Sequence, residues 1–283
     1  MNVRSSADHY AAVAHVEQRR SGAPSPSVGT MLLLHGLGGD TTQFDAFLPH
    51  LARLPYDLLM PDMRAHGRTE LTGDAHEFTF QHLSADIRAL LADRAVAQPV
   101  IGVGISMGAG VLAALAIQEP RTFAGLVFIR PAWEDRADPA NLRAFRDIAT
   151  LLASQNIAAA AAEFAQSPVY QAVRAESETA ADSLMDQFSA PHAAGRRLRL
   201  ARMPLSTPFA SLADLHRIRP PVAVIGTRHD PLHPLAIARN WAASCSATLS
   251  VVPPKSADDD RYFTESVAII TAVTNQVRDI ASA

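Results

Sequence analysis

Six short apolar runs alternate with longer helix-like segments along this chain, and that alternation limits the fold more than any other feature. The runs cover residues 28–34, 57–60, 99–103, 125–129, 221–225 and 248–252. They are continuous and rich in leucine and β-branched residues, which is typical of strands buried on both faces of a parallel sheet. The sequence therefore predicts an α/β fold in which helices cover both faces of a mostly parallel sheet.

Helical sequence fills the intervals between these runs and follows the last one. Helices are expected at residues 78–93, 109–119, 234–243 and 264–280. In the last of these, apolar residues from Val267 to Val277 lie near helical spacing, which predicts one buried face and one exposed face. The N-terminal residues 10–18 are a candidate for an antiparallel edge strand.

Residues 134–210 lack the strand pattern and are alanine-rich and helical, as in NLRAFRDIATLLASQNIAAAAAEFAQSP. An insertion of this length in an otherwise alternating chain predicts a helical cap over the sheet. The core is then formed by residues 1–133 and 211–283. The alternative is a packing extension that does not control access to a site.

Charge and cysteine content exclude several classes of function. The net charge of −3 and the charged fraction of 19% leave no basic stripe, so a nucleic-acid partner is not expected. Cys245 is the only cysteine, which excludes an internal disulfide and any C-x-x-C metal pair. The N-terminus has no continuous apolar segment. We therefore expect a cytoplasmic protein with no membrane partner, no metal and no cofactor.

The pentapeptide Gly104-Ile105-Ser106-Met107-Gly108 lies between an apolar run and an alanine-rich helical run. A G-x-S-x-G sequence in this context is typical of a nucleophile elbow, where a serine lies at a strained turn from strand to helix. Small residues on both sides relieve the crowding at such a turn. The pattern predicts Ser106 as a nucleophile.

A glycine-rich loop, His35-Gly36-Leu37-Gly38-Gly39, follows the first apolar run. Its backbone can turn N–H groups towards a developing oxyanion, so Leu37 N–H and Met107 N–H are predicted to form an oxyanion hole. It is not a phosphate loop, because no G-K-[ST] follows. His35 and Gly36 are candidates for lining the substrate site.

Two further loops follow predicted strands and carry polar residues. In GTRHDPLHP, Asp230 can orient an imidazole, or it can end a turn before the next helix. In DMRAHGRT, residues Asp62, Arg64 and His66 are expected to shape the loop by ion pairing and hydrogen bonding. After the fourth strand run, Arg130 and Trp133 are candidates for substrate binding, and Arg130 can instead pair with a nearby carboxylate.

The chain resembles an α/β-hydrolase-fold protein of the capped, single-domain kind, because HGLGGD, DMRAHGRT, GISMGAG and GTRHDPLHP occur in that family's order. The resemblance implies an eight-stranded, mostly parallel sheet and a cap that supplies most of the substrate pocket. It also implies Ser106 as nucleophile, Asp230 as acid and an oxyanion hole at Leu37 and Met107.

The family's catalytic histidine normally follows the last strand, but residues 252–263 contain none. Comparison with the family points to Tyr262 as the substitute position, and to Ala257 next. The pKa of a tyrosine is about three units above that of a base that works at neutral pH. Using a tyrosine as the base would therefore cost on the order of 4 kcal/mol unless the site lowers the tyrosine pKa. His233, on the acid loop, is the best candidate for an imidazole.

The sequence supports a serine hydrolase acting on an ester, thioester or lactone, with a non-standard general base. The alternatives are a non-hydrolytic enzyme of the same fold, catalysing acyl transfer, cyclisation or rearrangement, and a catalytically silent ligand-binding protein. The expected partner is a small-molecule acyl substrate, including a thioester of coenzyme A or of a carrier protein. A cluster of Arg196, Arg197, Arg199 and Arg202 is expected to form a solvated helix face or to bind such a carrier.

Overall fold

A single sheet forms the centre of the computed structural model, which describes residues 5–154, 156–255 and 257–283. Its strands are β1 (Val16–Arg19), β2 (Thr30–Leu34), β3 (Asp57–Pro61), β4 (Val100–Ile105), β5 (Gly125–Ile129), β6 (Val222–Thr227) and β7 (Thr248–Val252). They lie in the order β1-β3-β2-β4-β5-β6-β7, with β1 antiparallel to β3 and every other pair parallel. The predicted α/β class and mostly parallel sheet are confirmed.

Two details of the prediction differ from the structure. The described residues form seven strands rather than the eight that the family resemblance implied. The N-terminal segment divides into a helix, α1 (Ser6–Val13), and the short edge strand β1. The helix forms because Ser5 and Asp8 make a capping box that satisfies backbone N–H groups at its start.

The α-helices after α1 are α2 (Leu48–Leu51), α3 (Phe80–Asp93), α4 (Met107–Gln118), α5 (Arg143–Leu151), α6 (Ile157–Ala165), α7 (Pro168–Glu176), α8 (Glu178–Ser189), α9 (Leu198–Arg202), α10 (Leu235–Cys245) and α11 (Asp259–Ser282). Short 3-10 turns are η1 (Thr41–Phe44), η2 (Ala75–Glu77), η3 (Ala140–Leu142), η4 (Met203–Leu205) and η5 (Leu212–Arg217). Within the described ranges, none of the helices combines the length and apolar character needed to cross a bilayer.

Alternate residues of each central strand pack into two separate cores, one on each face of the sheet. In β2, Leu32 and Leu34 pack with apolar residues of α3, α4 and α10, whereas Met31 and Leu33 pack with residues of α2 and α11. The two-residue periodicity of a strand explains this division. A sheet covered on both faces leaves its strand ends as the place for polar chemistry.

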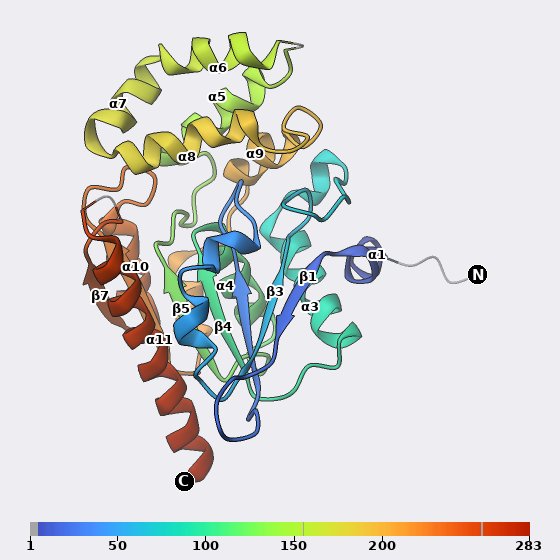
Figure 1. Cartoon of the computed structure of the whole chain (residues 1–283), viewed down its shortest axis with the longest axis vertical. Coiled ribbons are helices and arrows are strands. Elements are labelled where there is room, and N and C mark those ends of the chain that lie inside the picture. Colours follow the sequence, from blue (N-terminus) through green and yellow to red (C-terminus); the bar gives the residue numbers. More distant parts are fainter. Residues whose placement is uncertain (1–4, 155, 256) are drawn as a thin grey trace.

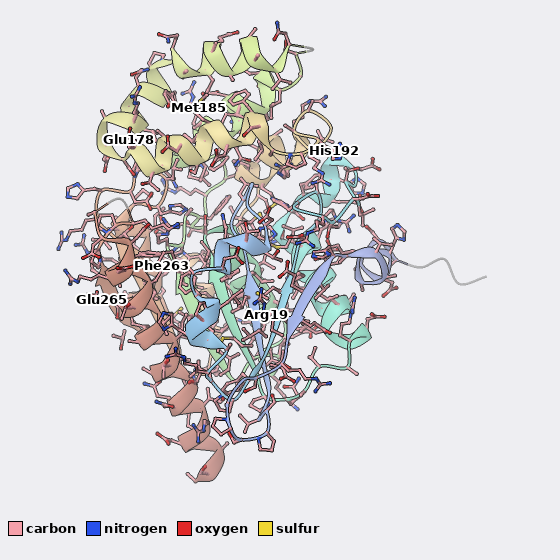
Figure 2. All side chains as sticks on the ribbon, in the orientation of Figure 1. Arg19, Glu178, Met185, His192, Phe263 and Glu265 are labelled. Atoms are coloured by element: carbon pink, nitrogen blue, oxygen red, sulfur yellow. The ribbon has the colours of Figure 1, made fainter. Side chains whose placement is uncertain are left out.

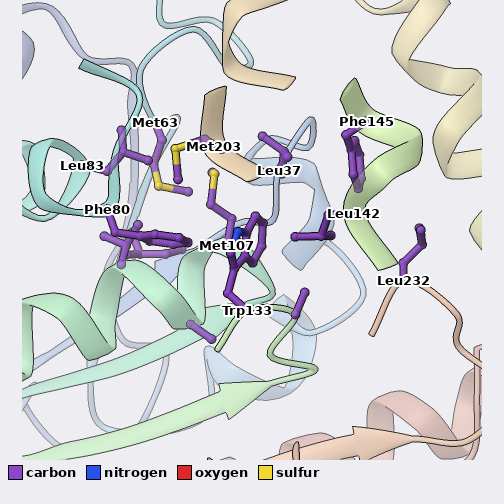
Figure 3. Packing of buried hydrophobic residues seen from close by; sticks show 14 of the residues in the cluster. Leu37, Met63, Phe80, Leu83, Met107, Trp133, Leu142, Phe145, Met203 and Leu232 are labelled. Atoms are coloured by element: carbon purple, nitrogen blue, oxygen red, sulfur yellow. The ribbon is translucent and has the colours of Figure 1, made fainter. Parts of the chain in front are cut away.

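Helices α5 to α9 lie together at one end of the molecule, and the C-terminal end of α11 lies at the other (Figure 1). Helices α5 to α9 and the following turn η4 are joined to the core through apolar contacts. Met203 of η4 lies beside Met63 and near Met107 (Figure 3). Phe80 and Trp133 pack below these methionines with ring centroids 5.2 Å apart. Residues of the 134–210 segment therefore share one apolar core with the helices on that face of the sheet.

A buried ion-pair network ties the N-terminal helix to the core. Arg64 donates to Asp86 at 2.7 Å and to Glu77 at 3.2 Å, and both Arg64 and Asp86 are almost fully buried. Its guanidinium also donates to the hydroxyl of Ser6, at the start of α1, at 2.9 Å. The network connects α1, the loop after β3, η2 and α3.

Candidate active site

Ser106 occupies the turn between β4 and α4 with a backbone that L-residues rarely adopt, φ 53° and ψ −108°. Its N–H donates to the carbonyl of Ile129 at 2.9 Å, which holds the turn against the end of β5. A Cβ on Gly108 would lie 2.2 Å from the carbonyl oxygen of Leu34, and a Cβ on Gly104 would lie 2.5 Å from the N atom of Ala109. Both flanking glycines are therefore required by close backbone approach.

The imidazole of His233 lies between Ser106 and Asp230. Its Nε2 is 3.0 Å from Ser106 Oγ, and its Nδ1 is 3.0 Å from both carboxylate oxygens of Asp230. In this geometry Nδ1–H can donate to the carboxylate while Nε2 accepts the serine proton. The structure thus brings together the serine, imidazole and carboxylate that nucleophilic acyl chemistry uses.

A short turn of the acid loop places this imidazole. Asp230 Oδ1 accepts the backbone N–H of His233 at 3.1 Å, and the same N–H lies 3.2 Å from the carbonyl oxygen of Asp230. Pro234 then ends the turn just before α10. Because this turn folds the His233 ring back over the carboxylate, an acid and an imidazole only three residues apart in the sequence can contact each other. His229 has a φ of 54° and makes no hydrogen bond to Ser106 within the described residues.

Asp230 is held as a carboxylate by its neighbours. Burial by itself would raise the pKa of Asp230, but the imidazole of His233 and the guanidinium of Arg130 hold it well below its usual range. Arg130 Nη1 lies 3.2 Å from Asp230 Oδ2, and the hydroxyl of Thr227 lies 3.4 Å from the same oxygen. The predicted substrate-binding or ion-pairing residue Arg130 therefore pairs with the acid of the site, a partner that the sequence did not indicate.

Tyr262 lines the same region but makes no hydrogen bond to Ser106 in the described part of the chain. Its ring lies beside Arg130, whose Cζ is 5.5 Å from the ring centroid. Burial raises the pKa of Tyr262, an effect that Arg130 opposes. The geometry therefore does not support Tyr262 as the base, and Ala257, its predicted alternative, is exposed in the preceding loop.

The two predicted oxyanion donors lie on adjacent turns. Met107 is the first residue of α4, where backbone N–H groups have no partner within the helix. For Leu37 N–H, no acceptor is found among the described residues. The preceding Gly36 donates its N–H to Gln43 Oε1 at 2.8 Å, a contact that the sequence did not suggest. Both donors remain candidates for an oxyanion hole.

His35 supports the glycine-rich loop rather than lining the substrate site. It is fully buried, its Nδ1 lies 2.8 Å from the carbonyl oxygen of Gly36, and its Nε2 accepts the N–H of Met63 at 3.0 Å. Burial lowers the pKa of His35. The predicted substrate-binding role of this residue is therefore not supported, because both ring nitrogens are occupied inside the protein.

His66 supports the same loop from the other side. Its Nδ1 lies 2.7 Å from the carbonyl oxygen of Arg64, and its Nε2 accepts the N–H of Gly38 at 3.1 Å. Burial, with a contribution from the Arg199 guanidinium, lowers the pKa of His66 well below the usual value. Both hydrogen bonds require a neutral ring that donates from Nδ1, so the loop depends on an uncharged His66.

A cavity of about 340 Å³ opens above Ser106. Gly36, Leu37, Arg130 and His233 line it on the core side, together with Tyr262. The predicted substrate-binding Gly36 thus borders the cavity.

Trp133, in contrast, is completely buried away from the cavity and packs beside Phe80 (Figure 3). Its carbonyl oxygen accepts Trp241 Nε1–H at 2.8 Å. The predicted role of Trp133 in substrate binding is not supported.

Helix α8 forms the opposite wall of the cavity with polar side chains that the sequence analysis did not single out. Thr179, Ser183 and Gln187 lie four residues apart on this helix, and Asp186 lies beside them. Such i, i+4 spacing of polar residues was the signal available in the sequence. Figure 2 labels Glu178 at the start of α8 and Phe263 near the start of α11, and Phe263 also lines the cavity.

The cluster of four arginines is only partly on the surface. Arg202 is exposed and Arg197 is partly buried, but Arg196 and Arg199 are buried. Their guanidinium groups donate to backbone carbonyl oxygens of the loop after β3. The expectation of a solvated helix face is therefore wrong for these two residues.

The mostly parallel sheet and the turn that carries Ser106 define an α/β protein with a nucleophile elbow. Comparison of sequences identifies the family. The sequence matches the α/β hydrolase fold family over residues 29–260, and the chain belongs to that family. An AB hydrolase superfamily protein from Gibberella zeae is 35% identical over 103 residues, which are 36% of this chain and 36% of that protein. The matched segment is thus about a third of the length of this curated relative.

Solved structures show the same fold at lower sequence identity. An esterase from Thermogutta terrifontis has a TM-score of 0.66 and 20% identity, covering 92% of this chain and 93% of that chain. The enol-lactonase from Burkholderia xenovorans LB400 has a TM-score of 0.68 and 18% identity, covering 91% of this chain and 97% of that chain. At these identities the likeness establishes the fold alone. The family match and these two structures therefore agree on the α/β hydrolase fold.

Proposed function

We propose that this protein is a serine hydrolase of a small ester, thioester or lactone, with Ser106, His233 and Asp230 as its catalytic triad. The observation that carries the proposal is the position of His233, with one ring nitrogen 3.0 Å from the serine hydroxyl and the other 3.0 Å from the carboxylate. An imidazole in this position supplies the general base that the loop after the last strand lacks. The non-hydrolytic and ligand-binding alternatives rested on that missing base.

In the acylation step, Ser106 Oγ attacks the carbonyl carbon while His233 Nε2 accepts the hydroxyl proton. The tetrahedral oxyanion is bound by the N–H groups of Leu37 and Met107. When the bond to the leaving group breaks, the imidazolium returns the proton to the departing oxygen or sulfur. The acyl group remains on Ser106.

In the deacylation step, His233 removes a proton from water, which attacks the acyl carbonyl, and the released acid leaves Ser106 with its proton restored. Asp230 orients the imidazole and stabilises the imidazolium that forms in both steps. Arg130 keeps Asp230 ionised in its partly buried site, and so acts through Asp230 rather than on the substrate. The base is thus a histidine on the acid loop.

The cavity restricts the size and polarity of the substrate. A volume of about 340 Å³ is at the lower end of ligand sites, which span about 300–1,000 Å³. Hydroxyl, carboxylate and amide groups of α8 line it together with apolar residues such as Leu37 and Phe145. The small volume and the mixed lining favour a small acyl compound with a polar group as substrate. If the substrate is a thioester of coenzyme A or of a carrier protein, only its acyl end fits in the cavity. The esterase and enol-lactonase of similar fold are consistent with such a substrate.

We propose that residues 134–210 act as a cap. Support comes from helix α8, which lies within this segment and forms the cavity wall opposite Ser106. Its apolar contacts with the core make it part of the same packed unit. Cap and core together would exclude water from the substrate. The cytoplasmic location stays a prediction.

A fluorophosphonate probe tests the covalent mechanism, because it labels only an activated serine. We expect labelling of the wild type and its loss in Ser106→Ala. Ser183→Ala is the matched control, since Ser183 also lines the cavity but lies on α8, and we expect it to label normally. Labelling that persists in Ser106→Ala, or folded wild-type protein that does not label, would contradict the proposal.

A further inference from the structure

A second cavity, of about 150 Å³, lies between the cap and the glycine-rich loop. It is lined by residues of three segments: Gly38 to Thr42 of that loop, Asp62, Gly67 and Arg68 after β3, and Ala190, Pro191, Arg196 and Arg199 of the cap. The glycine-rich loop also lines the first cavity, so it forms a common wall of the two. Arg68 and Pro191 are exposed, and the second cavity is therefore open to small solutes.

Two buried guanidinium groups line this cavity, and neither has an acidic partner within the described ranges. Arg196 donates to the carbonyl oxygens of Gly67 at 2.7 Å and of Thr69 at 3.3 Å. Arg199 donates to the carbonyl oxygens of Ala65 at 3.1 Å and of Arg196 at 3.3 Å. Among the described residues, neither forms a salt bridge, and Arg199 Nε is buried with no hydrogen-bond partner. Buried charges are ordinarily paired, so this arrangement lacks a counter-charge.

The acidic residues on the cavity wall do not supply that counter-charge. Asp62 uses its carboxylate to accept the backbone N–H groups of Thr41 at 2.9 Å and Arg68 at 2.8 Å. Asp40 accepts the N–H of Thr42 at 2.9 Å. Burial and the neighbouring Arg196 lower the pKa of Arg199 to about 10, so Arg199 is still charged at neutral pH. The positive charges of Arg196 and Arg199 therefore lie close together where both side chains are buried.

We propose that the second cavity binds a small oxyanion, a carboxylate or phosphate group, through Arg196 and Arg199. The planar fork of a guanidinium suits the paired oxygens of such a group. Arg199 lines the cavity, and its Nε has no hydrogen-bond partner among the described residues. The volume accommodates a group of this size. The group is either free inorganic phosphate or the anionic end of a substrate. This site is separate from the catalytic triad, and its occupancy is measurable without any ester hydrolysis.

Binding of inorganic phosphate is measured by isothermal titration calorimetry at constant ionic strength, with sodium chloride as the balancing salt. We expect saturable binding to the wild type. Arg199→Gln and Arg196→Gln should weaken it at least about tenfold, because each removes charge-assisted hydrogen bonds. Arg202→Gln is the matched control: Arg202 belongs to α9 as Arg199 does but is exposed, and this variant should bind within about twofold of the wild type.

If Arg199→Gln does not fold, Arg199→Lys replaces it, since lysine keeps the charge but lacks the Nε donor and the planar fork. We then expect weaker phosphate binding with retained structure. Wild-type protein that shows no saturable binding would overturn the proposal, and so would an Arg202→Gln variant that loses as much affinity as the variants of the buried arginines.

The source of the anion is decided by comparing p-nitrophenyl acetate with the mono-p-nitrophenyl ester of glutaric acid. If the bound oxyanion is part of the substrate, phosphate inhibits cleavage of the glutaric acid half-ester competitively. Arg199→Lys then raises the KM for the half-ester but not the KM for p-nitrophenyl acetate. If phosphate binds and neither KM responds, the site holds a free anion. If neither ester is cleaved, the proposed hydrolase function fails while the binding result stands.

Discussion

The position of one imidazole decides how this site is interpreted. His233 reaches Ser106 because a three-residue turn after Asp230 folds its ring back towards the elbow. Proton transfer depends on distance and orientation, and not on the place of a residue in the chain. A base from the acid loop is therefore physically equivalent to one that follows the last strand. Tyr262 and Arg130 occupy the space beside the acid instead.

Two neutral histidines that hold the glycine-rich loop, His35 within it and His66 beside it, make folding stability depend on pH. Burial lowers the pKa of His35 and His66, so below pH of about 6.5 the unfolded chain binds protons that the folded protein does not. The free energy of unfolding must then decrease as pH falls below this value, by at most about 1.4 kcal/mol per pH unit for each histidine. Urea unfolding at pH 7.5, 6.5 and 5.5 measures the slope.

His66→Gln isolates the contribution of one ring, since glutamine can still accept the Gly38 N–H but does not titrate. We expect the variant to lose less stability than the wild type over the same pH range. Asp86, whose pKa is raised to about 6 by burial, contributes with the opposite sign, because the folded protein gains its proton first. That contribution is common to both proteins and cancels in the comparison. Equal slopes would show that folding does not lower the pKa of His66.

At the level of elements, the elbow requires a close crossing of α4 over β2. Gly108→Ala would place its Cβ 2.2 Å from the Leu34 carbonyl oxygen, a backbone atom that cannot move without shifting the sheet. We expect a loss of about 3 kcal/mol in the free energy of unfolding, together with loss of activity. Gly195→Ala is the control, because the nearest atom to its Cβ would be 3.6 Å away, and it should change stability by less than about 0.5 kcal/mol. Similar effects of the two substitutions, measured by urea unfolding, would refute this account of the elbow.

The sequence predicted strands β2 to β7 and the main helices because their signals are local: apolar runs for buried strands and helical spacing for α11. It did not predict that residues 10–13 are helical, since a capping box at Ser5 and Asp8 lies outside the segment that suggested a strand. The cavity wall on α8 was also missed. Polar residues on one face of a helix indicate an exposed face equally well, and only tertiary structure shows what that face borders.

The site as a whole was predictable in its backbone and much less in its side chains. Parallel strands end at one edge, so loops carrying Ser106, Leu37 and Asp230 had to converge. Side-chain direction is not fixed by that rule. Arg130 pairs with Asp230, and Trp133, three residues later, turns into the core. The contacts that decide these directions come from segments distant in the sequence.

Across the whole molecule, Arg64 connects segments that local sequence does not relate. Arg64→Met would leave Asp86 buried without its partner and release Ser6 of α1. We expect a loss of about 3–5 kcal/mol in the free energy of unfolding, measured by urea denaturation. Arg88→Met is the matched control, because the Arg88–Glu119 pair is exposed and should contribute less than about 1 kcal/mol. Equal losses would contradict the structural role of the buried network.

The most direct test of the account compares kcat/KM for p-nitrophenyl ester hydrolysis in His233→Gln and Tyr262→Phe. If His233 is the general base, His233→Gln lowers kcat/KM by about 10³-fold or more in folded protein, while Tyr262→Phe, which lacks only the phenolic hydroxyl, stays within about tenfold of the wild type. The reverse order, with Tyr262→Phe inactive and His233→Gln active, would contradict the placement of the base on the acid loop.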